Sequence, residues 1–327
     1  MGRPVQPGIQ PLSASPSRQL KGSVMTKRIL TVPGLAIAAG LIAASLAPAG
    51  AQAAAESGGT VYLAATLLGE NEVPAPGAKA GDGNGSAVAV FRIHGRQVDY
   101  AIRWQKVAAP TAFHIHQGKA GKNGDVKIPF FGAALPAGLS AVKGSVAVKD
   151  AGLLARIKNN PKGWYANLHT GEFPGGAVRA QLHRIRPVAL EEVLAHGAGT
   201  TLTAVADGRQ EVPAPGTKVG DKDGRAAWLV WVQGTRVHFA TAWRGIAAPT
   251  NGHVHRGVKG KNGPVVVDFF AAKSGLPAGI NGVAGTGTAA PKVAKGIKNN
   301  PKGWYTNLHT GEFPGGAVRG QLHKGAW

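Results

Sequence analysis

The sequence contains no cysteine among its 327 residues. A disulfide framework and a lipoprotein anchor are therefore excluded, and its domains must be held by core packing alone. It also lacks a Gly-x-Ser-x-Gly motif, a nucleophile–histidine–aspartate set and a phosphate-binding loop. Because these common catalytic signatures are missing, we expect no enzymatic activity from the motifs alone.

Acidic residues are scarce, since 16 Asp and Glu stand against 37 Lys and Arg, for a net charge of +21. Such a charge attracts anionic surfaces. No run of basic residues and no interleaving of basic with aromatic residues marks a nucleic-acid site. We therefore interpret the charge as a solvated basic surface, with an anionic cell-envelope polymer or an extracellular protein ligand as the alternative partner.

Residues 25–53 have the pattern of a targeting segment. A short basic region (25–28) precedes an uncharged apolar run (29–48), and a small-x-small site ends at Ala53. This pattern predicts a secretory signal peptide over residues 25–53, cleaved after Ala53. A membrane anchor is the alternative, because the run nears the ~20 residues that span a bilayer. Pro and Gly interrupt the run, so we expect a secreted, extracellular chain without a transmembrane segment.

Residues 1–24 resemble neither a signal nor a domain, and we interpret them as a mis-assigned start or a disordered segment, with translation beginning at Met25. Five basic residues and no acidic ones precede Ala54. The exported chain therefore keeps a net charge of +16.

The chain contains the same unit twice. Residues 157–183 recur at 297–323 with two differences, and a His-x-His pair and a Glu-Val-Pro-Ala-Pro-Gly segment recur 139 positions apart. A period this long indicates a duplicated domain rather than a solenoid. We expect one domain at 57–186 and another at 199–327, joined by a linker with one or two possible helical turns.

Strand patterns dominate each unit, with Gly- and Pro-rich turns between them. One helix is expected at 151–159 in the first unit and at 291–299 in the second. The predicted fold is all-β, with an antiparallel sandwich or barrel in each unit. The strands expected in the first unit are 60–67, 85–93, 97–104, 112–117, 126–131, 144–148, 163–169 and 177–183.

The candidate metal ligands are histidines. His114 and His116 flank one residue of a predicted strand, so their side chains share a face at a separation of ~6.5–7 Å and can chelate one ion. His169 is the best third ligand. All three recur in the second unit, as His253, His255 and His309. Imidazoles suit copper and zinc, with copper(II) bound more tightly, and binding should weaken below about pH 6. The alternative is that these histidines only hydrogen-bond to neighbouring loops.

Other recurring residues have weaker interpretations. The Gly/Asn loop at 117–124, with Lys119 and Lys122, can present backbone amides to an anion. Of Trp164 and Tyr165, one is expected in the core and the other at the rim.

Two glutamates also recur, in the Pro-rich segment that follows the first strand of each unit. We interpret Glu72 and Glu211 as turn residues rather than a catalytic carboxylate pair.

The ordered motifs of both units resemble the CHRD (chordin) domain across nearly the whole exported chain. In the first unit these are Glu72-Val73-Pro74, His114-Ile115-His116-Gln117-Gly118, Tyr165 to Thr170 and Phe173 to Leu182; the second unit matches at Glu211-Val212-Pro213, His253 to Gly257, Tyr305 to Thr310 and Phe313 to Leu322. The resemblance implies secreted, all-β, sandwich-like domains, which we expect as two tandem antiparallel Greek-key β-sandwiches of the immunoglobulin or superoxide-dismutase type. In animal chordin such domains belong to a protein that sequesters growth factors.

The family is also distantly similar to copper,zinc superoxide dismutases. That similarity implies copper ligands at the three histidines of each unit, and an anion-steering role for Arg179 and Arg319. The sequence departs from the dismutase pattern, because no histidine lies between His116 and His169 to supply a zinc site, and the disulfide is absent.

Two functions are compatible with these observations. The first is a secreted binding or adhesion module without catalytic activity, which accounts for the duplication and the charge. The second is a copper-dependent redox or copper-storage protein, which accounts for the recurring histidines. Copper is the one cofactor that the sequence suggests.

Overall fold

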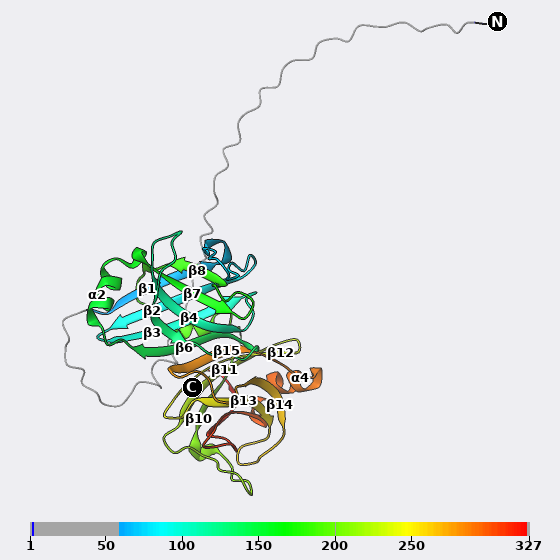
Figure 1. Ribbon diagram of the computed structural model, residues 1–327. Helices are drawn as coiled ribbons and strands as arrows, with labels where there is room; N and C mark the ends of the chain where they lie inside the picture. The colour runs from blue at the N-terminus through cyan, green and yellow to red at the C-terminus, as the bar shows by residue number, and fades with distance from the viewer. Residues whose placement is uncertain (1, 3–58, 200, 326–327) are drawn as a thin grey trace. The chain divides into compact units, whose positions relative to one another are not determined.

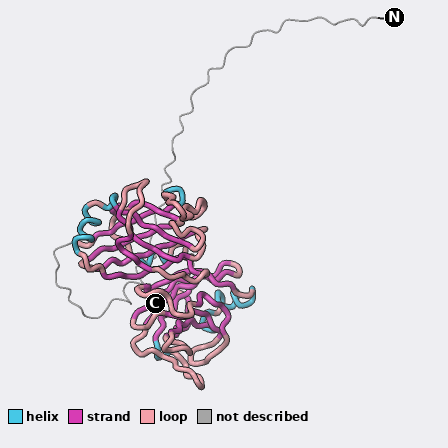
Figure 2. Tube along the Cα trace, viewed as in Figure 1, coloured by secondary structure: helices cyan, strands magenta, loops and turns pink. Residues whose placement is uncertain are grey.

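The computed structural model describes residue 2 and residues 59–199 and 201–325. The expected signal peptide, its cleavage site and the interpretation of residues 1–24 lie outside the described residues. Strands are the main secondary structure of each domain, and the helices are short (Figure 2). The all-β expectation is confirmed.

The first domain forms a sandwich of two antiparallel layers (Figure 1). One layer has the order β9-β1-β2-β3-β6 and the other has the order β8-β7-β4-β5. The connections from β3 to β4 and from β6 to β7 cross between the layers, which gives the Greek-key arrangement. Its strands are β1 (Val61–Leu68), β2 (Ser86–His94), β3 (Gln97–Gln105), β4 (Pro110–Gln117), β5 (Val126–Phe131), β6 (Leu139–Ala147), β7 (Trp164–Thr170), β8 (Val178–Gln181) and β9 (His183–Arg184).

The second domain repeats this order with β18 and β17 in the places of β9 and β8. Its strands are β10 (Leu202–Asp207), β11 (Arg225–Gln233), β12 (Arg236–Arg244), β13 (Pro249–Arg256), β14 (Val265–Ala271), β15 (Ile280–Thr288), β16 (Trp304–Thr310), β17 (Val318–Gln321) and β18 (His323–Lys324).

Side chains that alternate between the two faces of each strand explain which residues form the cores. Along β1, Leu63, Ala65 and Leu67 are fully buried while their neighbours face outward, as period-two burial requires. Aromatic rings fill the space between the layers: Tyr100 and Phe130 lie 4.5 Å apart between ring centroids. The two layers thus hold together without a disulfide.

The predicted helices occur where they were expected. α2 (Ala151–Asn159) begins after Asp150, whose side chain accepts a hydrogen bond from the backbone N–H of Leu153 as an N-cap. α4 (Pro291–Asn299) is its counterpart and starts with proline at its first position. Within the described residues, no helix is both long and apolar enough to cross a membrane.

Strand β6 differs from its prediction, because it starts at Leu139 rather than at residue 144. The added residues pair with β15 of the second domain in a self-complementary register. Leu139 lies opposite Gly285, and Ile280, the repeat equivalent of Leu139, lies opposite Gly144, the equivalent of Gly285. Equivalent edge strands therefore pair with each other, as across a two-fold axis.

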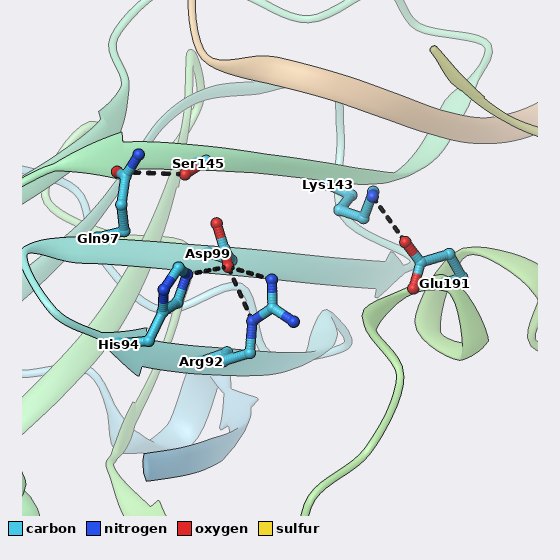
Figure 3. A network of polar contacts seen from close by, with 7 residues as sticks. All are labelled: Arg92, His94, Gln97, Asp99, Lys143, Ser145 and Glu191. Carbon is cyan, nitrogen blue, oxygen red and sulfur yellow. Dashed lines mark hydrogen bonds and ion pairs between the residues drawn. The ribbon is translucent and has the colours of Figure 1, made fainter. Parts of the chain in front are cut away.

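The linker contains a short helix, α3 (Leu190–Ala195). Leu190 packs on Val90 and Ala101 of the first domain. Figure 3 shows the polar side of this contact, where the ammonium group of Lys143 on β6 lies 2.7 Å from the carboxylate of Glu191. The sequence alone did not distinguish a helix from a plain linker in this segment. The structure has a helix there, and its apolar side chains pack on the first domain.

Candidate metal centre

The histidines lie on the outer face of the layer formed by β4, β7 and β8. On β7, Trp164, Ala166 and Leu168 point into the core, so the alternate residues Tyr165, Asn167 and His169 point outward. Register then places polar side chains side by side across the strands. His114 lies opposite Asn167, His116 lies opposite Tyr165, and His169 lies one step away, opposite Ala112.

The three histidines of the first domain converge. His114, His116 and His169 each offer a ring nitrogen, and these nitrogens all lie within 4.8 Å of one another. The ring centroid of His114 is 5.1 Å from that of His169 and 5.5 Å from that of His116. His116 is 8% exposed, and the other two rings are partly buried, so the cluster is accessible from one side.

Backbone carbonyls fix which nitrogen of each ring faces the cluster. The Nδ1 atom of His116 lies 2.9 Å from the carbonyl oxygen of Gly124, and Nδ1 of His169 lies 3.0 Å from that of Pro174. A carbonyl only accepts hydrogen bonds, so Nδ1 carries the proton in both rings and Nε2 keeps its lone pair. These Nε2 atoms and Nδ1 of His114 are buried without a hydrogen-bond partner among the described residues. Outer partners of this kind are typical of metal-ligating histidines.

The second domain builds the same cluster from β13 and β16. His253, His255 and His309 have ring nitrogens within 4.8 Å of one another. The Nδ1 atoms of His255 and His309 lie 3.0 Å and 2.8 Å from the carbonyl oxygens of Gly263 and Pro314. Both carbonyl contacts therefore recur, but Nε2 of His255 also lies 3.1 Å from Oδ1 of Asn307, whereas Nε2 of His116 has no hydrogen-bond partner among the described residues.

Burial keeps the clustered rings neutral. Desolvation, with a smaller effect of the neighbouring imidazoles, lowers the pKa of His114 to about 4 and that of His253 to about 3. Desolvation also lowers the pKa of His169 and His309, although their carbonyl partners act in the opposite direction. Neutral imidazole is the form that ligates a metal ion.

Tyr165 and Arg179 form a stack behind His116. The rings of His116 and Tyr165 are nearly parallel, with centroids 4.8 Å apart, and the guanidinium carbon of Arg179 lies 3.3 Å from the centroid of Tyr165. Both Trp164 and Tyr165 are buried, at 3% and 1% exposure, so the expectation that one of them lies at the rim is wrong. Tyr165 is buried under the loop at 118–124, whose Gly124 its hydroxyl contacts.

Arg179 ties that loop to the sheet. Its guanidinium donates to Oδ1 of Asn123 at 2.9 Å and to the carbonyl oxygens of Lys119 and Lys122. Arg319 makes the corresponding contacts with Asn262, Val258 and Lys261. The loop thus turns carbonyls toward a cation, rather than amides toward an anion as the sequence suggested. Anion steering by Arg179 and Arg319 remains a prediction.

The sequence interpretation missed the environment of the two recurring glutamates. Glu72 follows a 3-10 turn, but its carboxyl folds back over β7, where Nδ2 of Asn167 lies 3.5 Å from Oε2. Desolvation, opposed by the charge of Arg179, raises its pKa to about 7, and Glu211 behaves in the same way beside Arg319. In the sequence, the only signal of this buried environment is that a glutamate recurs in both Glu-Val-Pro segments.

A glycine makes room for each glutamate. A Cβ atom on Gly176 would lie 2.5 Å from Oε1 of Glu72 and 2.7 Å from the amide of Asn167, and the φ of Gly176 is +124°. Gly316 meets Glu211 in the same way at φ +132°. The Phe-Pro-Gly-Gly motif therefore supplies a carbonyl for the third histidine and space for the glutamate.

Comparison with known proteins agrees with this duplicated arrangement. The CHRD domain family model matches residues 63–182 and again residues 202–322. No curated protein matches the sequence. The chain belongs to the CHRD domain family and contains two CHRD domains in tandem, as the sequence motifs predicted.

Proposed function

We propose that this protein is an extracellular binding protein in which each CHRD domain holds one metal ion through three histidines. The ligands are Nδ1 of His114, Nε2 of His116 and Nε2 of His169, with His253, His255 and His309 in the second domain. Copper(II) is the ion that we expect to bind most tightly, since imidazole sites follow the general order of divalent affinities.

The observation that carries this proposal is the convergence of three imidazoles in each domain, two of which in the first domain turn an Nε2 lone pair toward the cluster. A hydrogen-bonding role alone does not require two carbonyls to hold Nδ1 of His116 and of His169 so that both lone pairs face one point. The donor set is nitrogen only, which suits copper and zinc and does not suit calcium or magnesium. The same set recurs in the second domain.

Three protein ligands leave a coordination position for water or another ligand. The positive charge of Arg179 acts on His116 and contributes to lowering its pKa. We propose that this charge, and that of Arg319, favours an anion at the open position. The proposal is one of binding, and no redox step is assigned to the site.

Titration calorimetry tests the function. Metal-free protein titrated with copper(II) should bind two ions per chain. A His114→Ala variant should retain one site, and the double variant His114→Ala/His253→Ala should retain neither. Exposed histidines also bind copper weakly, so the control is a His183→Ala/His196→Ala variant, which alters exposed histidines outside both clusters and should keep both sites. Equal binding by the double variant and the control would contradict the proposal.

Adhesion to an anionic polymer of the cell envelope is the second candidate. Lys119, Lys122 and Lys162 are exposed, and their ammonium groups form no ion pair in the part of the chain that the structure describes. The loop at 118–124 and the turn before β7 contact each other through Gly118 and Gly163, which gathers these lysines at one end of the domain. Binding to an anionic polymer should fall with added salt and with the variant Lys119→Glu/Lys122→Glu/Lys162→Glu. Salt-independent binding would exclude this role.

A further inference from the structure

The two clusters differ at one position in the strand beside them. In the second domain, His253 pairs with Asp268 on β14, whereas in the first domain His114 pairs with Pro129 on β5. The carboxylate oxygen Oδ1 of Asp268 lies 3.3 Å from Nε2 of His253. Proline has no side-chain acceptor, and no hydrogen bond to either ring nitrogen of His114 is formed within residues 59–199 and 201–325.

Asp268 biases which nitrogen of His253 faces the cluster. Its side chain is 81% exposed, but the negative charge of its carboxylate beside Nε2 favours the tautomer that carries the proton there and leaves the lone pair on Nδ1. That Nδ1 atom lies 3.2 Å from Nε2 of His309, which also keeps its lone pair because Nδ1 of His309 faces the carbonyl oxygen of Pro314. In the other tautomer of His253, Nδ1 donates a hydrogen bond to His309, whereas in the tautomer that Asp268 favours the two lone pairs face each other and repel unless a cation lies between them. Two metal–nitrogen bonds of ~2.0–2.1 Å at a tetrahedral angle span about 3.3 Å.

The first domain lacks this control. Because His114 has no such partner, its ring can carry the proton on either nitrogen. Only the tautomer without a proton on Nδ1 can bind a metal ion at that atom. A carboxylate on the outer nitrogen also makes the ligating nitrogen more basic, and loss of such a partner typically lowers metal affinity 10- to 100-fold. The sequence difference between Asp268 and Pro129 therefore has a direct chemical consequence.

We propose that Asp268 is a positioning residue that makes the second CHRD domain the high-affinity copper site and leaves the first domain as a weaker site. This inference rests on the proposed function, because it concerns the same clusters. A protein with two unequal sites binds one ion over a wide range of copper concentrations and takes up the second only when copper is abundant.

The test is a competition titration of the metal-free full-length protein with copper(II) against a chelator of known affinity, followed by electron paramagnetic resonance. The wild type should show two sites that differ 10- to 100-fold, and His253→Ala should remove the tighter one. Asp268→Asn should weaken the tighter site until the two are similar. Pro129→Asp, the reciprocal change, should strengthen the first site.

The matched control is Asp223→Asn, which removes one exposed acidic charge from the same domain and should leave both affinities unchanged. Two equal sites in the wild type, or unequal sites that Asp268→Asn does not alter, would overturn the inference while leaving the proposed function intact. A wild type that binds no copper at either cluster would overturn both.

Discussion

Nδ1 of His253 lies 3.2 Å from Nε2 of His309, while the other nitrogen of His309 faces the carbonyl oxygen of Pro314 and that of His253 lies 3.3 Å from the carboxylate of Asp268. In the tautomers that these outer partners favour, both facing atoms are acceptors. Desolvation lowers the pKa of both rings, so a shared proton near neutral pH is disfavoured. We propose that a metal ion is the cation that satisfies this arrangement.

Copper should stabilise the protein against unfolding. A ligand at 100 times its Kd stabilises the native state by about 2.7 kcal/mol per site if it does not bind the unfolded chain. Thermal denaturation with excess copper(II) should show a rise in Tm of several degrees for the wild type and no rise for His114→Ala/His253→Ala. An equal rise in both proteins would place the stabilising ion elsewhere.

Glu211 should make stability depend on pH. Its carboxyl is 9% exposed, and burial raises its pKa from 4.5 to about 7. Its contribution to stability is thus complete below pH 4.5 and is lost as the pH rises through 7, to a limit of about 3 kcal/mol at ~1.4 kcal/mol per pKa unit. Glu211→Gln does not titrate, so its Tm relative to wild type should increase from pH 5 to pH 8. The buried histidines act in the opposite direction but are common to both proteins. A pH-independent difference would show that Glu211 is charged in the folded state.

Gly176 should not tolerate a side chain. Gly176→Ala forces a Cβ against Glu72 and Asn167 at a backbone angle that favours glycine, and should cost ~2–4 kcal/mol. Gly171→Ala is the control, because a Cβ there meets nothing within 4 Å. Urea denaturation of the two variants measures the difference. Equal midpoints would mean that the Glu72 pocket relaxes freely.

Arg179 should hold the loop at 118–124 in place. Arg179→Met removes three hydrogen bonds to the loop while keeping an unbranched apolar side chain over Tyr165. Hydrogen exchange of the loop amides should accelerate at least 10-fold, since ~1–3 kcal/mol is lost with each buried unsatisfied acceptor. Lys119→Met, at an exposed position of the same loop, should leave the exchange unchanged. If the loop amides of Arg179→Met exchange as slowly as those of the wild type, other contacts hold the loop in place.

Export should produce a chain that begins near Ala54. The expected signal peptide at 25–53 predicts protein in the culture medium or loosely held at the surface. N-terminal sequencing of the secreted protein tests this. A sequence that starts at Met1 would be inconsistent with cleavage, and material found only in membranes after a high-salt wash would favour the anchor.

Much of the fold could be predicted from the sequence because each layer alternates buried and outward residues. The His-x-His spacing placed His114 and His116 on one face for the same reason. The start of strand β6 is missed by the sequence, because Leu139 pairs with β15, far along the chain, and residues 141–143 pair with both β15 and β3. These long-range pairings leave no local periodicity in the sequence.

The outer contacts of the candidate site depend on the tertiary fold. Glu72 reaches Asn167 across 95 residues, and neither residue has a local pattern that marks a buried carboxyl. Asp268 becomes the partner of His253 only through the register of β13 and β14, which shifts beside His253. Alignment of the two repeats exposes the Asp268/Pro129 difference, but its meaning requires the strand pairing.

Anomalous diffraction at the copper absorption edge tests the central claim most directly. Crystals of the protein grown with two equivalents of copper(II) per chain should show one anomalous peak in each CHRD domain. Each peak should lie about 2 Å from the inward nitrogens of three histidines, namely His114, His116 and His169 or His253, His255 and His309. Fully copper-treated crystals without a peak at either cluster, or with peaks only at other residues, would contradict the account.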